Sequence, residues 1–198
     1  MNVTETKQRF NRIFDAYIKR EGSSALYNWL ESTDFFTAPA SSRFHCAYAG
    51  GLCEHSLNVF NNLMLIYEME KKANPEAVAN ISMESLAIVG LLHDVCKIDF
   101  YTIDYRNVKN KDGQWEKVPY YGINEKLPMG HGEKSVYLIN KYIKLTDDEA
   151  LAINWHMGGF DKRVIGGDNS ISNAFEKSAL SVLLQTADFL ASYINEKR

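Results

Sequence analysis

The stretch LAIVGLLHDVCKI, residues 86–98, decides how the rest of this chain is interpreted. Residues 86–92 are apolar apart from Gly90, so a helix formed from them has no polar face. Such a helix is typical of the centre of a domain rather than of its surface. His93 and Asp94 follow directly. The sequence therefore predicts a central helix whose carboxyl end carries an imidazole and a carboxylate into the interior.

The flanking sequence predicts further helices. Apolar residues recur at intervals of three and four over the first twenty residues, which indicates an amphipathic helix. Thr146 and Glu149 have the spacing of a capping box. Asn74-Pro75 places proline at the first position of a short helix. Further helices are expected from Ser23 or Ser24 to Leu30, from about Leu52 to Lys71, and from Ser82 into His93-Asp94. Helices resume after Gly130, the helix that begins at the capping box runs to Trp155, and the last helix runs from about Ala174 to the end.

A β-hairpin is expected within this helical pattern. Residues 100–108 and 115–121 are rich in aromatic and β-branched residues, and Asp112-Gly113 between them is a turn signal. The aromatic side chains, with Lys109, Lys111 and Lys117 nearby, could stack on nucleic-acid bases. They could equally pack the hairpin onto the helices. We favour packing, since aromatic residues are common in strands for that reason.

The overall composition is that of an ordinary globular domain. The chain has 198 residues, 45% of them hydrophobic, and a net charge of −3, which excludes a disordered tail protein and a broadly basic nucleic-acid coat. We expect one mainly α-helical domain over residues 1–198, with a helical extension at 1–43 and a core at 44–193. Three cysteines without a CxxC pair favour free thiols in the cytoplasm, and no segment is long enough to span a membrane.

Polar residues at unusual positions suggest a metal site. Asp188 lies on the apolar face of the last helix, where an unpaired carboxylate would cost several kcal/mol. His55 and His131 follow glycines near helix starts, and His156 ends a helix. Imidazoles and carboxylates together suit transition metals. The alternative is that each histidine is an ordinary hydrogen-bonded residue and that Asp188 pairs with a lysine or caps a helix.

At this point the sequence resembles the His-Asp (HD) superfamily of metal-dependent phosphohydrolases. The resemblance rests on the order His55, His93-Asp94, Asp188 and on the segments YAGGLCEHSLNV, residues 48–59, and LLHDVCKI, residues 91–98. It covers roughly residues 44–193 and is strongest to the HD domains of bacterial exoribonucleases that also carry an OB-fold, and to HD domains linked to conjugative relaxases. No OB-fold precedes the domain here. Cys96 replaces the glycine that commonly precedes the motif lysine.

The resemblance implies an HD-type helical bundle and hydrolysis of a phosphoester by a metal-activated water. It implies one or two divalent ions, with manganese, iron, cobalt, nickel or zinc favoured over magnesium because the ligands include many histidines. Lys97 would neutralise charge on the phosphate, or is a solvated lysine past a helix end. The implied metal ligands are His55, His93, Asp94 and Asp188, with His131 and His156 added for a second ion bridged by Asp94.

Other residues are candidates for substrate contacts or support. His45 and Arg43 precede the glycine turn, and Lys162 and Arg163 follow Gly158-Gly159; all could meet phosphate or simply face solvent. Glu54 and Glu133 could orient histidines or complement helix dipoles. For Cys53 and Cys96 we favour buried packing over zinc binding.

We expect a hydrolase acting on a nucleotide, another phosphorylated small molecule or a short single-stranded nucleic acid, with a protein partner able to supply specificity. The alternative is a non-catalytic HD module that binds a nucleotide or a nucleic-acid-processing partner.

Overall fold

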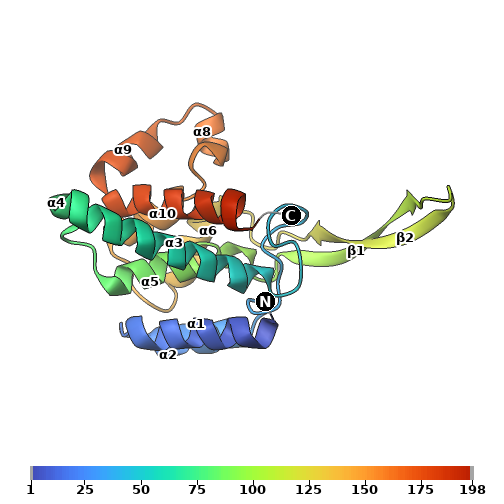
Figure 1. Cartoon of the computed structure of the whole chain (residues 1–198), viewed down its shortest axis with the longest axis horizontal. Coiled ribbons are helices and arrows are strands. Elements are labelled where there is room, and N and C mark those ends of the chain that lie inside the picture. The colour runs from blue at the N-terminus through green and yellow to red at the C-terminus, as the bar shows by residue number, and fades with distance from the viewer. Residues whose placement is uncertain (1, 197–198) are drawn as a thin grey trace.

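The computed structural model describes residues 2–196, which form ten α-helices and one two-stranded antiparallel sheet (Figure 1). The mainly α-helical fold with a small hairpin is as the sequence predicts. None of the described helices is both long and apolar enough to cross a membrane. In chain order the elements are α1 Val3–Tyr17, α2 Ser23–Glu31, α3 Gly51–Ala73, α4 Pro75–Val78, α5 Met83–Leu92, β1 Tyr101–Lys109, β2 Trp115–Ile123, α6 His131–Ile139, α7 Asp147–Trp155, α8 Lys162–Ile165, α9 Ser170–Lys177 and α10 Ala179–Leu190, with 3₁₀ turns at Val95–Lys97 and Gly158–Phe160 and a π-helical turn at Ala191–Asn195.

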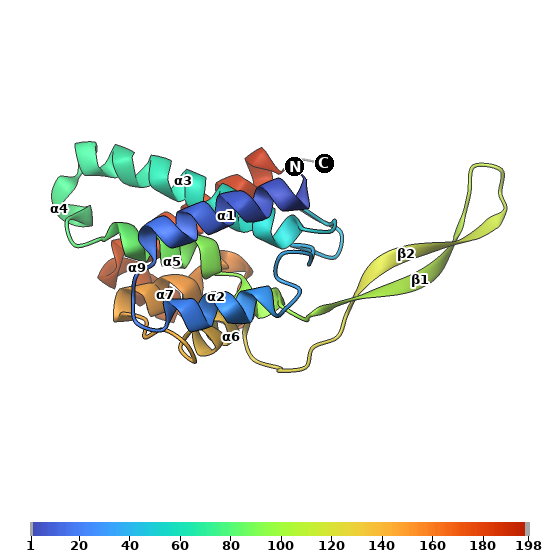
Figure 2. The same ribbon diagram turned by 90° about the horizontal axis from the view of Figure 1, so that it is seen from below.

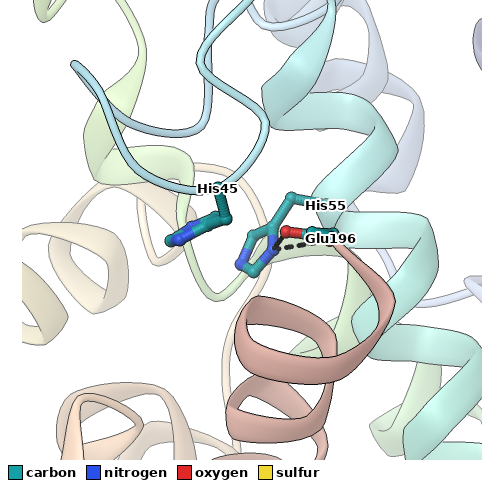
Figure 3. Close-up of side chains that lie close together, drawn as sticks. All are labelled: His45, His55 and Glu196. Carbon is teal, nitrogen blue, oxygen red and sulfur yellow. Dashed lines mark hydrogen bonds and ion pairs between the residues drawn. The ribbon is translucent and has the colours of Figure 1, made fainter. Parts of the chain in front are cut away.

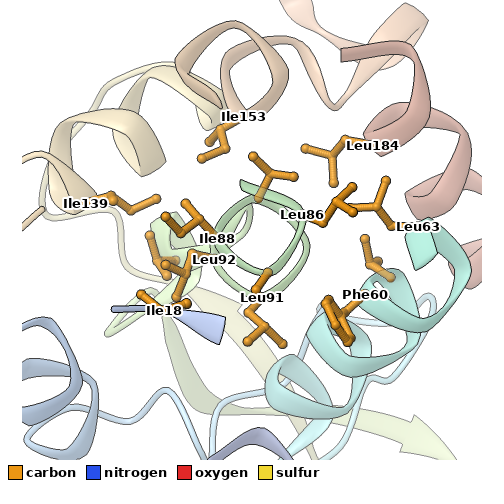
Figure 4. Close-up of a cluster of buried hydrophobic side chains, with 14 of the residues drawn as sticks. Ile18, Phe60, Leu63, Leu86, Ile88, Leu91, Leu92, Ile139, Ile153 and Leu184 are labelled. Atoms are coloured by element: carbon orange, nitrogen blue, oxygen red, sulfur yellow. The ribbon is translucent and has the colours of Figure 1, made fainter. Parts of the chain in front are cut away.

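Helix α5 lies at the centre of the core, which confirms the prediction from its composition. All of residues 86–92 are buried. Figure 4 shows side chains surrounding this helix on every side, from α3, α6, α7 and α10 among others. Each fully buried leucine or isoleucine contributes about 1.5–3 kcal/mol through the area removed from water. Ser82 caps the amino end by accepting a hydrogen bond from the Ser85 amide.

Gly90 brings α5 into direct contact with α3. A Cβ added at Gly90 would lie 3.0 Å from the Cα of Phe60, closer than side chains normally approach a backbone. This contact fixes the carboxyl end of α5 beside the amino-terminal half of α3. His93 and Asp94 are thereby placed next to His55.

The predicted bounds of α2 agree with the structure to within one residue, and those of the last helix are wrong. Helix α2 begins at Ser23, and Gly22 before it has a φ of 89°, a backbone conformation that glycine readily adopts in the tight turn after α1. The expected final helix is broken at Ser178, whose backbone is extended, and a π-helical turn follows α10. Serine is a weak helix former that tolerates such a boundary. The break allows α9 and α10 to point in different directions.

The hairpin does not pack onto the helices, so the favoured interpretation of its aromatic residues is wrong. Figures 1 and 2 show β1 and β2 extending well beyond the helical body. Tyr105, Trp115 and Tyr120 are exposed. The strands pair with each other from Tyr101 opposite Ile123 to Lys109 opposite Trp115, and the base of the hairpin, at Tyr101, contacts the helical body through a hydrogen bond to the Ala40 carbonyl.

Candidate metal centre

The proposed ligands come from five separate helical elements and meet at one end of the core. His55 lies in the second turn of α3, and His93 and Asp94 follow α5. Their ligand atoms, together with those of the remaining residues, fall into overlapping groups in which all atoms lie within 4.8 Å of one another. These groups contain His55, His93 and Asp94; His93, His156 and Asp188; and Asp94, His131 and His156.

Asp94 is the centre of the cluster. Its Oδ1 lies 2.9 Å from His131 Nε2 and 3.4 Å from His156 Nε2, and its Oδ2 lies 3.5 Å from His55 Nε2. Burial opposes ionisation of this carboxyl, but the Lys97 ammonium and the surrounding imidazoles hold its pKa well below the usual range. Asp94 is therefore a carboxylate with one oxygen toward each of two histidine groups, as a bridging ligand requires.

His93 and His156 are held in one orientation by backbone carbonyls. His93 Nδ1 lies 3.1 Å from the Gly90 oxygen, and His156 Nδ1 lies 2.7 Å from the Ile153 oxygen. A nitrogen that faces a carbonyl must donate, so in the neutral ring Nε2 keeps its lone pair. His156 Nε2 is buried without a hydrogen-bond partner among the described residues. His93 Nε2 lies 3.3 Å from His55 Nε2, so both rings turn Nε2 toward the cluster.

His55 is oriented by a carboxylate instead. Its Nδ1 lies 3.0 and 3.1 Å from the two oxygens of Glu196, and the Asn58 side chain donates to the same carboxylate over 2.9 Å (Figure 3). His55 Nε2 then faces His93 Nε2 at 3.3 Å and Asp188 Oδ1 at 3.2 Å. Such hydrogen bonds to the outer nitrogen of a histidine fix the tautomer that binds metal.

The donor set fits a divalent cation. Imidazole nitrogens and carboxylate oxygens lie close enough together to bind one cation, and buried carboxylates such as Asp94 need positive charge beside them. Burial opposes protonation of His55, but Asp188 and Glu196 outweigh it and raise its pKa to about 10, so the position favours a positive charge. Burial lowers the pKa of His93 to about 3, which keeps that ring a neutral ligand.

Lys97 lies at the cluster, in the 3₁₀ turn that follows α5. Its Nζ lies 2.5 Å from Asp94 Oδ2. Burial disfavours the ammonium, but Asp94 raises the pKa of Lys97 above its ordinary value. The interpretation of Lys97 as a solvated lysine is wrong because its side chain is buried.

His45 lies beside the cluster and Arg43 does not. The His45 ring centroid is 4.7 Å from that of His55, on the side opposite Glu196 in Figure 3. Burial lowers the pKa of His45 to about 4, so it is a neutral group near the ligands. Arg43 is exposed, stacks over Phe44 and lines a cavity of about 430 Å³ that also reaches Glu196.

Arg163 is occupied by protein contacts. Its guanidinium lies 2.7 Å from Asp161 and 2.7 Å from Glu133, and 3.9 Å above the Trp155 ring. The exposed-loop interpretation is therefore wrong for Arg163, whereas Lys162 is exposed. Both line a cavity of about 270 Å³ whose wall also includes His131. The cavity reaches the Asp94 cluster at His131, whose Nε2 lies 2.9 Å from Asp94 Oδ1.

The remaining candidates divide between packing and support. Cys53 lies in the hydrophobic core, as expected. Cys96 is also buried, but its sulfur is 4.0 Å from Asp94 Oδ1, at the edge of the cluster. Glu133 bonds Arg163, and no contact orienting a histidine is found for it among the described residues. Glu54 lines the larger cavity.

Sequence reasoning missed Glu196. It lies in a charged segment near the carboxyl end that is typical of a solvated helix terminus. The π-helical turn at Ala191–Asn195 redirects it toward His55, and that turn has no clear signal in the sequence. Glu196 is nevertheless one of the best-placed polar groups beside the cluster.

Comparison with known proteins yields one match. The sequence model of the family described as HD domain matches residues 52–192, which include all of the proposed ligands. No curated protein and no solved structure matches the chain significantly.

Proposed function

The chain belongs to the HD domain family, whose members are generally metal-dependent hydrolases, and from that premise we propose that it hydrolyses a phosphoester with one or two bound divalent ions. The observation that carries the proposal is the buried cluster of imidazole and carboxylate groups around Asp94. Imidazoles and carboxylates are directed at one another there, with their outer atoms already engaged by backbone or Glu196.

The family resemblance implies two ligand sets that share Asp94. The first set is His55, His93, Asp94 and Asp188, in which the first three have ligand atoms within 4.8 Å of one another and His55 Nε2 lies 3.2 Å from Asp188 Oδ1. The second set, Asp94, His131 and His156, is another such group. Two divalent ions held there would lower the pKa of a bound water and supply a hydroxide nucleophile. Nitrogen-rich sets favour manganese, iron, cobalt, nickel or zinc over magnesium.

Residues of the chain itself would neutralise charge on a bound phosphate and guide it to the cluster. Lys97 holds Asp94 Oδ2 and brings a buried positive charge to the cluster, where it would stabilise negative charge that develops on a phosphate. The cavity beside His131 gives a substrate access to that end of the cluster, and exposed Lys162 on its wall can attract an anion. Arg163 shapes this wall through its bonds to Asp161 and Glu133.

We place the substrate among nucleotides, other phosphorylated small molecules and short single-stranded nucleic acids. The likeness of residues 48–59 and 91–98 to OB-fold-linked exoribonucleases supports this choice, and a protein partner could add specificity. The three cysteines are free, as the reducing cytoplasm would keep them.

The test combines metal analysis with hydrolysis. Protein purified without chelator is expected to contain a transition metal and to hydrolyse bis(p-nitrophenyl) phosphate, or one of a panel of nucleotides, when manganese is added. Asp94→Ala should lose both metal and turnover. Lys97→Ala should keep the metal and lose about a hundredfold in turnover, since one electrostatic donor to a transition state is worth that order.

Three results would contradict the proposal. If Asp94→Ala contained as much metal as the wild-type protein, the metal would not be bound by the Asp94 cluster. If the wild-type protein hydrolysed none of the substrates with any of the metals, a non-catalytic binding module would be favoured. Loss of metal from Lys97→Ala would make that lysine structural.

A further inference from the structure

The projecting hairpin has two chemically different faces. Residues paired directly across an antiparallel sheet lie on the same face, and successive pairs alternate between faces. The pairing therefore places most of the aromatic side chains together. We call this side the aromatic face; its residues are Tyr101, Ile103, Tyr105, Asn107, Lys109, Trp115, Lys117, Pro119, Tyr121 and Ile123.

The aromatic face is exposed along most of its length. Trp115 is 68% exposed, Tyr105 58% and Ile103 64%. Figure 2 shows that the ribbon leaves the helical body, so the distal side chains do not contribute to the core. A two-stranded ribbon is only marginally stable by itself. Large apolar side chains on such a ribbon point to a bound partner.

Charge identifies the class of that partner. Lys109 stacks over Trp115 and Lys117 over Tyr105, each at 5.3 Å from the ring centroid. None of the described residues on the aromatic face is acidic, whereas the opposite face carries Asp104 and Glu116. Alternating aromatic rings and ammonium groups suit a polyanion that has flat rings of its own. Single-stranded nucleic acid is such a ligand.

The base of the aromatic face lies next to the cavity of about 270 Å³. Tyr101, at the base of the ribbon, is half-buried, and its hydroxyl donates to the Ala40 carbonyl. Its ring lies 6.2 Å from that of Tyr121 on the same face and 5.0 Å from that of Phe100. Phe100, the preceding residue, is not part of the aromatic face, and it lines the cavity together with His131. A strand that lies along the ribbon would therefore reach the cavity by passing from Tyr101 to Phe100 at the base of the ribbon.

We propose that the aromatic face binds single-stranded nucleic acid and directs one end of it toward the Asp94 cluster. Tyr105 and Trp115 stack on bases, and Lys109 and Lys117 contact phosphates. The delivery of a strand end for cleavage rests on the proposed hydrolase function, but binding by the ribbon does not. A protein partner or a second copy of the chain fits the apolar side chains, but neither explains why the only charged side chains of the aromatic face, Lys109 and Lys117, are basic and lie over its rings.

The test measures binding separately from cleavage. Fluorescence anisotropy of labelled 12-nucleotide oligothymidylate and oligouridylate is recorded in EDTA, so that no strand is hydrolysed. Tyr105→Ala and Trp115→Ala should each weaken binding by about fivefold to a hundredfold, the range measured for stacking on one base. Lys109→Ala with Lys117→Ala should reduce the slope of log Kd against log salt by about 1.4, since each phosphate contact contributes about 0.7.

Matched controls come from the other face of the same strands. Tyr120→Ala removes an aromatic ring and Arg106→Ala the cation that stacks on it, at 5.5 Å, and both should leave oligonucleotide binding within twofold of wild type. Tyr105→Phe should restore binding because it keeps the ring. Equal losses from both faces would show that the ribbon had merely unfolded and would overturn the assignment of a face.

The outcomes separate this inference from the proposed function. Hydrolysis of a simple phosphodiester without oligonucleotide binding would overturn the inference and keep the function. Oligonucleotide binding through the aromatic face, without hydrolysis of any substrate with any metal, would keep the inference and overturn the proposed function. If Trp115→Ala instead converts a dimer to a monomer in analytical ultracentrifugation and leaves oligonucleotide binding unchanged, the face binds a second copy and the inference is wrong.

Discussion

At the level of single residues, the contact between Glu196 and His55 links the carboxyl-terminal segment to the metal centre. A carboxylate that accepts from Nδ1 makes the opposite nitrogen a stronger ligand and fixes the plane of the ring. Burial opposes ionisation of Glu196, but His55 and Asn58 lower its pKa below the ordinary value. Glu196 therefore carries the negative charge that this role needs.

We expect Glu196→Gln to weaken metal binding by about tenfold to a hundredfold, the usual cost of losing such a partner. Titration with cobalt, followed by its visible absorption, measures both the affinity and the geometry of the ligands. The matched control is Glu176→Gln, which changes an exposed glutamate on α9 and should leave the titration unchanged. Identical cobalt spectra and affinities for wild type and Glu196→Gln would rule out the orienting role.

The sequence predicts some of these residues better than others. His93 and Asp94 could be foreseen as interior groups because an apolar helix leads directly to them. Asp188 could be foreseen because the apolar face of its helix leaves it no exposed position. The structure brings these residues together, although their roles stay predictions. Glu196 and the contacts of Arg163 depend on how distant segments meet, which no local pattern encodes.

At the level of elements, Glu149 of α7 ties the amino-terminal helices to the core. Its carboxylate accepts from the Thr146 amide in a capping box and from Arg20, at 2.6 and 2.9 Å. Arg20 lies in the turn between α1 and α2, and the Glu149 side chain is fully buried. Burial raises its pKa, but Arg20 and the Thr146 amide outweigh this and hold the pKa below 4.5.

We predict that Glu149→Gln lowers the free energy of unfolding at pH 7 by on the order of 3 kcal/mol, because it leaves Arg20 without its buried partner. A depressed pKa in the folded state stabilises the protein above the unfolded value, near 4.5, and this stabilisation is lost as the pH falls through the folded value. The difference between wild type and variant should therefore shrink below pH 4.5 in urea titrations.

Asp148→Asn is the control for this prediction. It changes an exposed carboxylate in the same first turn of α7, and its loss should cost about 0.3–1 kcal/mol through the helix dipole alone. A pH-independent difference for Glu149→Gln, or an equal loss in both variants, would contradict the account.

Element type was easier to predict than element position. The capping box at Thr146, the proline at the start of α4 and the hairpin turn at Gly113 all rest on local chemistry, and the structure has them. The break at Ser178 and the projection of the hairpin (Figure 2) have no comparable local signal. The sequence of the hairpin predicts strands but contains no information about what, if anything, they cover.

At the level of the whole molecule, the centre couples metal binding to folding. Its proposed ligands come from α3, α6, α10 and the segments after α5 and α7, so a bound ion would link elements that are distant in the chain. An ion at a hundred times its Kd stabilises the folded state by about 2.7 kcal/mol. For a chain of this size that corresponds to roughly 5–10 °C in Tm.

Scanning calorimetry with manganese and then with chelator should show this shift in the wild-type protein. Asp94→Ala lacks the ligand shared by both sets, so its Tm should not respond to manganese. A shift of equal size in Asp94→Ala would mean that the ion acts elsewhere on the molecule.

Helices α1 and α2 lie outside the segment that matches the family, yet they complete its interior. Phe10, Leu26 and Leu30 are fully buried in the same hydrophobic cluster as α5. A fragment of residues 52–192 alone would therefore expose apolar core side chains to solvent and lack Arg20, the partner of Glu149. For this protein, the boundary drawn by homology is narrower than the boundary drawn by packing.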